Sequence, residues 1–335
     1  MSQKYATLKD VAAEVGLSKA QVARALRGDP GVKSTTRAQV EKVAQAMGYR
    51  ANIAARNLAS ARSTIVGLVI GEPMNPFHIQ LAQAIDRELA DAGLEPIISL
   101  RAVDDRSALR EADRLISMRA AGAILIGTPH GEKTIIEMAT CLPCVYLGKH
   151  IDHPAVSTVS VDDGEGVGKA MEYLIAAGHR HIAHITANTE AAVAERLSSY
   201  IQAMRSAGLE PVVHTGGSDA NAGRTGVDAL LQRSPRPTAI LAYNDFIAVG
   251  VINRLHGLGL RVPEDMSVIG FDDIPAAASE TLSITTLRQD PEYQACRAVE
   301  ALLTVMREPE GGAQKIVLPV ELKLRRSVLP VRHTN

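Results

Sequence analysis

Strong hydrogen-bond donors gather on one face of a short segment near the N-terminus. They are Lys19, Gln21 and Arg24, with the small residue Ala20 among them. At helical spacing these side chains lie away from the apolar residues of the same segment, so they stay accessible. Amide and guanidinium groups can read base edges in the major groove of DNA, and a lysine can contact bases or phosphates. The pattern predicts a DNA recognition helix.

Two capping boxes and a glycine turn are predicted to hold this face in place. Thr7 and Asp10 form the pair that opens the first helix. Ser18 and Gln21 open the second, and Gly16 supplies the turn between them. Both helices have apolar residues at helical spacing that can pack together: Leu8, Val11, Ala12, Val15, Val22, Ala25 and Leu26. The pattern is typical of a helix-turn-helix, and a solvated helical hairpin is the alternative interpretation.

The charge of the first 62 residues favours the DNA-binding interpretation. They hold 11 Lys and Arg residues against 4 acidic ones, a net charge of +7, whereas the whole chain carries −1. Residues 63–335 therefore carry −8. A basic head joined to an acidic body is the charge distribution expected of a polyanion-binding module.

The predicted head continues into a third helix. The turn cluster Gly28–Gly31 precedes this helix, and Ser34 is predicted to cap it. Four of its residues can close a three-helix core: Val40, Val43, Ala44 and Met47. Beyond Gly48, the Ala-rich stretch 52–60 is too short to be stable as an isolated helix. We expect that stretch to fold only when it is docked.

From residue 64 onwards, strand-like apolar runs alternate with helical patterns. The expected strands are Thr64–Ile70, Pro96–Leu100, Gly122–Thr128, Pro143–Gly148, Thr158–Val161, His181–Thr186, Val212–Thr215, Ala239–Tyr243 and Ser267–Phe271. The expected helices include Ile79–Ala92, Arg106–Met118, Gly166–Ala177, Glu195–Ala207 and Asp245–Leu258. Such alternation predicts an α/β fold with parallel sheets covered on both faces.

The number of strands allows one sheet, but two smaller sheets are favoured. Thr158–Asp163 and Ser283–Gln289 are two places where the chain can cross between them. We therefore predict a helix-turn-helix head and a hinge helix, followed by two doubly wound parallel-sheet lobes. Ligands of such sheets bind beyond the carboxyl ends of the strands, so a cleft between the lobes is the expected binding site.

Composition excludes several classes of protein. With 335 residues, of which 46% are hydrophobic, the chain can form two or three domains. No apolar run is long enough for a membrane span, and the N-terminus is polar and basic without the apolar stretch of a signal peptide. A cytoplasmic location is therefore expected, and the three cysteines suit a reducing compartment.

Few motifs suggest an enzyme. Cys141 and Cys144 could form a redox pair, but the strand-like residues after them favour core packing. No second Cys/His pair completes a zinc site. The first expected strand is not followed by Gly-x-Gly-x-x-Gly, and Asp163–Gly168 has neither that spacing nor a Walker lysine after it. We therefore expect no catalytic site, no bound metal and no cofactor. An enzyme and a solute-binding protein remain the alternatives to a DNA-binding protein.

Several motifs occur together in a known order: Thr7–Ala12, Gly48–Leu58, Asn75–Phe77, Gly178–Ala183, Tyr243–Asp245, Gly259–Asp273 and Ile284–Thr286. In this series the chain resembles the LacI/GalR family of transcriptional repressors over nearly its whole length. The resemblance implies a homodimer that binds a near-palindromic operator in double-stranded DNA. It also implies a core like that of a type I periplasmic binding protein, which holds a small-molecule effector.

The resemblance extends to individual DNA-binding residues. It implies that Lys19, Ala20 and Arg24 face bases, with Thr7, Ser18 and Gln21 nearer the phosphates. In the hinge it implies that Leu58 inserts into the minor groove, with Asn52 and Ala55 close by. The chain departs from the common family pattern at four positions, which affects operator choice and hinge rigidity: Gln21, Ala23, Arg27 and Ala51.

The effector site is likewise implied by resemblance. The matching positions are Phe77, His78, Thr128, Lys149, Arg196, Asn244 and Asp272. Asp272 and Asn244 suit bonding of neighbouring hydroxyls, and the Arg196 fork suits hydroxyl or carboxylate oxygens. A cationic pocket for a sugar acid and a pocket for a neutral sugar are both open. Asn244 could instead be a structural amide, Asp272 a turn cap and His78 a surface residue.

The expected domain boundaries follow from the same family resemblance. They are the head, 1–48; the hinge helix and linker, 49–62; the N-terminal lobe, 63–161 plus about 290–320; and the C-terminal lobe, 162–289 plus about 321–330. The expected function is a repressor of carbohydrate-metabolism genes controlled by a sugar or sugar acid. A corepressor-dependent repressor or an activator is the alternative. Without a leucine-heptad tail, a dimer is favoured over a tetramer.

Overall fold

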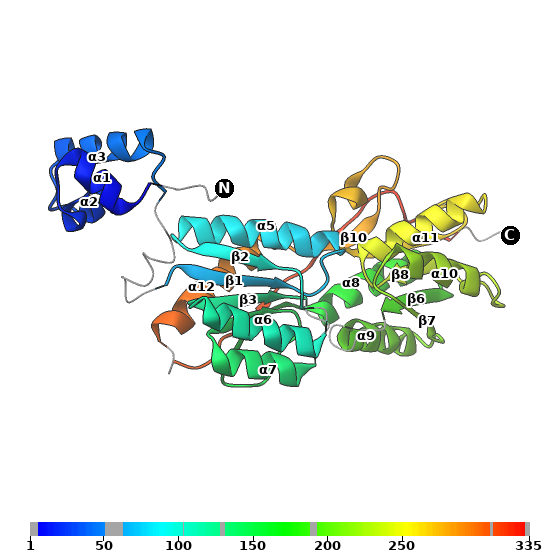
Figure 1. Cartoon of the computed structure of the whole chain (residues 1–335). Coiled ribbons are helices and arrows are strands. Elements are labelled where there is room, and N and C mark those ends of the chain that lie inside the picture. The colour runs from blue at the N-terminus through cyan, green and yellow to red at the C-terminus, as the bar shows by residue number, and fades with distance from the viewer. Residues whose placement is uncertain are drawn as a thin grey trace. The chain divides into compact units, whose positions relative to one another are not determined.

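The computed structural model describes residues 6–50, 63–102, 104–127, 131–187, 193–308 and 311–331. The chain divides into two compact units, Met1–Ser63 and Thr64–Asn335, here called the head and the core (Figure 1). Four expected site residues lie outside the described residues: Asn52, Ala55, Leu58 and Thr128.

The described part of the head, residues 6–50, contains α1 (Leu8–Val15), α2 (Lys19–Leu26) and α3 (Ser34–Ala46). Both predicted capping boxes are confirmed. In the second, the Gln21 amide N–H donates to Ser18 Oγ at 3.3 Å, and the Ser18 amide N–H donates to Gln21 Oε1 at 3.0 Å. Gly16 ends α1 with φ of 73°, a left-handed conformation that glycine adopts without steric cost.

The head has its own small apolar core, as the helical spacing predicted. Val11, Val22 and Val40 come one from each helix, and each is fully buried. The prediction that Ser34 caps the third helix was wrong. Ser34 is already the first residue of α3, and the capping position falls on Lys33, whose side chain makes no capping hydrogen bond.

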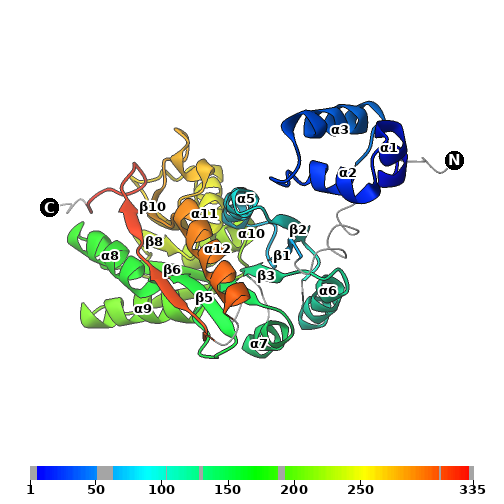
Figure 2. The same ribbon diagram turned by 90° about the vertical axis from the view of Figure 1, so that its left-hand side faces the viewer.

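The first sheet of the core has the order β11-β5-β4-β3-β1-β2 and is parallel throughout. Its strands are β1 (Ile65–Ile70), β2 (Glu95–Ser99), β3 (Gly122–Ile126), β4 (Cys144–Leu147), β5 (Val156–Val161) and β11 (Lys315–Leu318). Helices α5 (Pro76–Asp91) and α12 (Pro291–Arg307) pack together over one face, and α6 (Asp105–Ser117) and α7 (Glu132–Cys141) cover the other (Figure 2). Both faces are therefore apolar, which explains the continuous hydrophobic runs.

The second sheet has the order β12-β10-β9-β8-β6-β7. Its strands are β6 (Ile182–Ala187), β7 (Val212–Gly216), β8 (Ala239–Ala242), β9 (Ser267–Asp272), β10 (Thr285–Arg288) and β12 (Glu321–Lys323). Only the β10–β12 pair is antiparallel. Four helices flank this sheet: α8 (Asp163–Ala176), α9 (Val193–Ser206), α10 (Ala220–Leu230) and α11 (Asp245–Gly257). The short 3-10 helix η1 (Pro275–Ala278) follows β9.

The chain passes between the sheets three times. It leaves the first sheet after β5, returns to it after β10, and leaves again between β11 and β12. The first two passages fall in or directly beside the segments that the sequence predicted for crossing. The two doubly wound parallel-sheet lobes are thus confirmed, and the alternative of one continuous sheet is wrong.

The tight packing of α10 on α11 depends on two glycines. A Cβ at Gly250 would lie 1.9 Å from the carbonyl oxygen of Ala220, and a Cβ at Gly223 would lie 2.2 Å from that of Ile247. Backbone atoms cannot move aside as a side-chain tip can. The two helices therefore tolerate no added methyl group at these positions.

We predict that Gly250→Ala destabilises the core by at least about 1–3 kcal/mol, because overpacking must separate α10 from α11. Gly168→Ala in α8 is the matched control, since no heavy atom lies within 4 Å of its added Cβ. That control gains up to about 1 kcal/mol from helix propensity. Urea unfolding followed by circular dichroism measures both. Equal stability of Gly250→Ala and the parent protein would contradict this packing.

Candidate functional site

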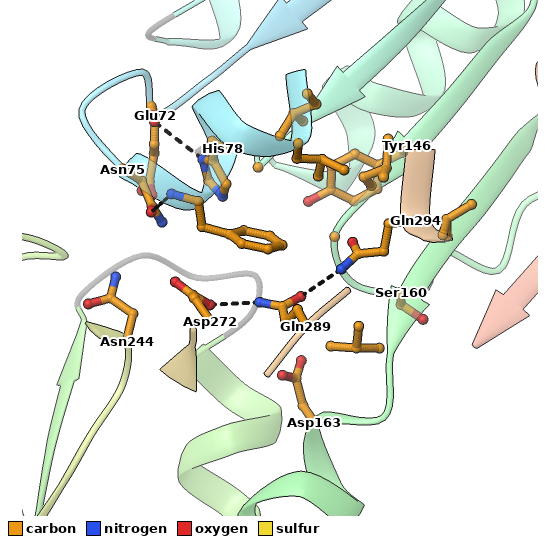
Figure 3. Close-up of a pocket in the computed structure, with 18 of the residues that line it drawn as sticks. Glu72, Asn75, His78, Tyr146, Ser160, Asp163, Asn244, Asp272, Gln289 and Gln294 are labelled. Atoms are coloured by element: carbon orange, nitrogen blue, oxygen red, sulfur yellow. Dashed lines mark hydrogen bonds between the residues drawn. The ribbon is translucent and has the colours of Figure 1, made fainter. Parts of the chain in front are cut away.

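A polar pocket lies between the two sheets of the core, lined by residues of both lobes (Figure 3). Phe77 and Tyr146 come from the first lobe, and Asn244 and Asp272 come from the second. The cavity measures about 100 Å³, several times the roughly 10–15 Å³ that one water molecule needs. The space suits a small molecule held by both lobes.

Arg196 is the cation of the described pocket lining, and two of its three nitrogens already donate hydrogen bonds. Its Nε donates to Asp163 Oδ1 at 2.6 Å, and its Nη1 donates to the carbonyl oxygen of Tyr243 at 2.7 Å. The guanidinium carbon lies 3.5 Å from the centre of the Phe271 ring. Burial opposes the charge, but Asp163 raises the pKa of Arg196 above its ordinary value. Nη2, which has no hydrogen bond within the described ranges, is the donor left for a ligand.

Asp272 stands at the end of β9 in an unusual backbone conformation. Its φ is 113°, and that of Asp273 is 61°. Such angles are costly for residues with a side chain and persist only where the surroundings hold them. The Ile274 amide N–H donates to Asp245 Oδ2 at 2.9 Å, and Arg325 Nη2 donates to Asp273 Oδ1 at 2.6 Å. The turn that presents Asp272 is thus fixed from two sides.

The Asp272 carboxyl group is buried but has a donor beside it. Gln289 Nε2 donates to Asp272 Oδ1 at 2.7 Å, and Gln294 Nε2 donates to Gln289 Oε1 at 3.2 Å (Figure 3). Burial raises the pKa of Asp272 to about 7, a rise limited by the nearby Arg196 guanidinium and the Gln289 amide. Near neutral pH this group can therefore accept or donate a hydrogen bond to a ligand.

Asn244 lines the pocket and also has a structural role. Its Oδ1 accepts from the Ile247 amide at 2.8 Å and caps α11, while its Nδ2 donates to the carbonyl oxygen of Ser218 at 3.1 Å. Both polar atoms are therefore engaged. This geometry supports the structural-amide alternative, and one amide hydrogen remains for a ligand.

Phe77 and His78 lie at the start of α5, and both line the pocket. Burial lowers the pKa of His78 to about 4, so its ring is neutral at pH 7. The ring nitrogen Nδ1 lies 3.2 Å from the carbonyl oxygen of Glu72. A Cβ at Gly127 would lie 2.0 Å from the ring, so the imidazole packs directly on that backbone. His78 is thus half-buried at the pocket wall rather than a free surface residue.

The structure does not bring Lys149 to this pocket. Its Nζ lies 3.3 Å from Glu132 Oε2, and Lys149 is absent from the described lining. Among the described residues, the charged groups that line the pocket are three acids, Glu72, Asp163 and Asp272, and one cation, Arg196. The cationic pocket that a sugar acid would favour is therefore not found among the described residues.

Sequence reasoning missed several residues of this site. Asp163, Gln289 and Gln294 are the most important, because each bonds to Arg196, to Asp272 or to a residue that does. One available signal was that Gln289 ends a predicted crossing segment, where a polar side chain reaches both lobes. A Cβ at Gly148 would lie 2.4 Å from Tyr146 Oη. The tyrosine hydroxyl thus occupies the space beside that glycine.

The predicted DNA-contacting side chains of the head are all exposed within the described ranges. They are Thr7, Ser18, Lys19, Ala20, Gln21, Arg24 and Arg27. Four of them have partners within the head. Thr7 pairs with Asp10 and Ser18 pairs with Gln21 in the two capping boxes. Gln21 Oε1 is part of the α2 capping box, and Arg24 pairs with Asp29. Lys19, Ala20 and Arg24 lie on α2, and Arg27 follows at its C-cap.

A helix-turn-helix head joined to a two-lobed core with a polar pocket defines a ligand-responsive, DNA-binding regulator. Comparison with known families agrees with this class. Residues 7–52 match the model of bacterial regulatory proteins of the lacI family, and residues 171–328 match that of a periplasmic binding protein-like domain. The chain is 30% identical over 331 residues to the HTH-type transcriptional repressor CytR of Escherichia coli K12, covering 96% of each protein. The chain belongs to the LacI family.

Two solved structures share the fold. A Lac repressor dimer bound to operator and the anti-inducer ONPF matches with a TM-score of 0.85 and 24% identity, covering 97% of this chain and 100% of that one. A complex of the transcriptional regulator CelR with cellobiose matches with a TM-score of 0.72 and 27% identity. That match covers 96% of this chain and 99% of the CelR chain. The family consists of regulators, so the prediction of a non-enzyme is confirmed. Within the described ranges, no helix has the length and apolar character needed to cross a bilayer.

We predict that the stability difference between Asp272→Asn and the parent protein depends on pH. The pKa of Asp272 is raised from its usual 3.8 to about 7, so between these values the folded protein keeps a proton that the unfolded chain loses. The parent therefore loses stability as pH rises from about 4 to 7, and the variant does not. We expect the melting temperature of the variant relative to the parent to rise by several degrees from pH 5 to pH 8.

Asp265→Asn is the control for this experiment. The hydrogen bond from Arg261 lowers the pKa of Asp265 to about 2, so its titration is complete below pH 5. Its melting-temperature difference should stay constant from pH 5 to pH 8. A constant difference for Asp272→Asn as well would show that this carboxyl group does not titrate in the expected range.

Proposed function

We propose that this protein is a homodimeric transcriptional repressor of carbohydrate-metabolism genes, acting in the cytoplasm, whose affinity for operator DNA is controlled by a small sugar. The pocket that joins the two lobes through Asp272 and Gln289 is the observation that carries the proposal. The two structural matches support it, since one is a dimer bound to its operator and the other is a complex with a sugar.

The proposed DNA contacts are those expected from the sequence. Lys19, Ala20 and Arg24 read bases, with Arg27 beside them, and Thr7, Ser18 and Gln21 lie nearer the phosphates. The exposure of these side chains on the capped head supports this assignment. Asn52, Ala55 and Leu58 are proposed to enter the minor groove at the operator centre.

The effector is proposed to bind between lobes with the expected bounds, 63–161 plus about 290–320 and 162–289 plus about 321–330. Phe77 packs on the sugar, while Arg196 Nη2, Asn244 and Asp272 bind its hydroxyls. His78 and Thr128 are proposed to complete the wall, whereas Lys149 pairs with Glu132 away from the described lining and is left out of the proposed contacts. Since a ligand shifts an equilibrium only by binding one state better, the sugar must favour one arrangement of the lobes.

A neutral sugar is the better candidate than a sugar acid. The described lining has more carboxyl groups than cations, and Arg196 is already paired with Asp163. His78 is neutral at pH 7, since burial lowers its pKa to about 4. An added carboxylate would therefore lose its water without gaining an unpaired cation, which is unfavourable in a buried site.

A matched ligand panel tests this proposal. Each neutral aldose is paired with its uronic acid and applied to the full-length protein at pH 7.5. Thermal shift measures ligand binding, and fluorescence anisotropy measures binding to DNA from the promoter of the protein's own gene. We expect a neutral member, and not its acid, to raise the melting temperature and to release the DNA.

Two variants separate the parts of the proposal. Asp272→Ala should lose the ligand response and still bind the DNA, whereas Arg24→Ala should lose discrimination for the DNA and keep the thermal shift. Stabilisation by the uronic acids alone would contradict the neutral-sugar assignment. A normal ligand response in Asp272→Ala would remove this residue from the binding site.

A further inference from the structure

The guanidinium group of Arg24 is held by a residue outside the recognition helix. Arg24 Nε donates to Asp29 Oδ2 at 2.8 Å, and Arg24 Nη2 donates to Asp29 Oδ1 at 3.2 Å. These two parallel bonds form a fork that fixes the plane of the guanidinium. Unlike a single surface ion pair, a bidentate pair of this kind is geometrically specific.

The carboxylate that holds Arg24 is itself anchored. Asp29 Oδ1 also accepts from the Gly31 amide N–H at 2.8 Å. The backbone of the same loop is tied to α3, because Arg37 Nη2 donates to the carbonyl oxygens of Gly28 and Asp29 at 2.9 and 3.0 Å. Asp29 is therefore a fixed point in the head and not a mobile surface acid.

Gly31 provides the space that this arrangement needs. A Cβ at position 31 would lie 2.7 Å from Arg24 Nη2 and 3.1 Å from Asp29 Oδ1. The glycine is not required for a left-handed backbone there, since its φ is not positive. Because Gly31 has no side chain, the Arg24 guanidinium has room to lie beside the Asp29 carboxylate.

We propose that Asp29 is a positioning residue that sets the base preference of Arg24. The carboxylate takes the Nε side of the guanidinium, and the remaining N–H groups of Nη1 and Nη2 are left to donate to a base. That edge matches the O6 and N7 acceptors of guanine. An arginine that is already held in one conformation loses less side-chain freedom when it binds DNA. It therefore discriminates better between guanine and the other bases. This inference rests on the proposed role of Arg24 as a base reader.

The charge of Asp29 gives the proposal a distinctive signature. The hydrogen bond from Arg24 lowers the pKa of Asp29 to about 2, so the carboxylate is ionised wherever DNA binding is measured. A negative charge in a DNA-binding head weakens binding to every sequence through the phosphates. Removing it should therefore raise general affinity while lowering discrimination. Damage to the head fold would lower both.

Selection from a random duplex library tests this inference with the full-length protein. Sequencing of bound DNA at fixed salt gives the preference at each base position for the parent, Arg24→Ala, Asp29→Asn and the double variant. Glu41→Gln is the matched control, because Glu41 is an exposed acid of α3 with no hydrogen bond or ion pair in the part of the head that the structure describes.

We expect Arg24→Ala to lose guanine preference at one position of each half-site by roughly 10- to 100-fold. Asp29→Asn should reduce preference at that same position by roughly 3- to 10-fold, leave the other positions unchanged and strengthen binding to non-specific DNA. The double variant should discriminate no worse than Arg24→Ala, because the two residues act as one unit. Glu41→Gln should strengthen non-specific binding without altering preference.

Gly31→Ala keeps the test informative if Asp29→Asn unfolds the head. Its added methyl group meets the tip of a flexible side chain, so it displaces the Arg24 fork while the carboxylate remains. It should lose preference at the same base position. Unchanged or sharper preference in a folded Asp29→Asn or Gly31→Ala variant would overturn the inference. Unchanged preference in Arg24→Ala would instead overturn the proposed base-reading role of Arg24.

Discussion

The buried carboxyl group of Asp245 is the constraint on which the second lobe's half of the pocket depends. It has no solvent exposure, and its two oxygens accept from Thr286 Oγ1 at 2.6 Å and from the Ile274 amide at 2.9 Å. It also sits so close to β9 that a Cβ at Gly270 would lie 1.9 Å from it. These contacts join α11, β9 and β10 at one point. The strained turn that carries Asp272 persists because this buried network defines it.

A chain of hydrogen bonds connects that turn to the other lobe. Asp272 bonds to Gln289, which lies where the chain passes from β10 to α12, and Gln289 bonds to Gln294 on α12. Helix α12 packs against α5, the helix that carries Phe77. A ligand bound to Asp272 therefore competes with, or completes, the bonds that join the two lobes. The residues that we propose as ligand contacts are thus placed to change the arrangement of the lobes.

The sequence predicted best what depends on neighbouring residues. Both capping boxes were predicted because their partners lie three residues apart. The head core was predicted because apolar residues recur every three or four positions within each helix. The pairing of Arg196 with Asp163 was not predictable, because 33 positions separate them and only the fold brings them together. Lys149 was expected in the pocket from the family resemblance, but the fold turns its charge toward Glu132. Helix α10 was missed because its glycines, which serve close packing, weaken the helical pattern.

The distribution of charge limits how the two units can be coupled. Residues 1–62 carry +7 and residues 63–335 carry −8, so the net charge of the head attracts phosphates and that of the core repels them. Even within the head, one of the four acids, Asp29, pairs with Arg24. Its negative charge lowers the affinity of the head for DNA of any sequence. The head is therefore the part of the chain whose net charge favours binding to phosphates. The described lining of the pocket belongs to the core alone, so a ligand there can alter DNA affinity only indirectly, through a change that reaches the head.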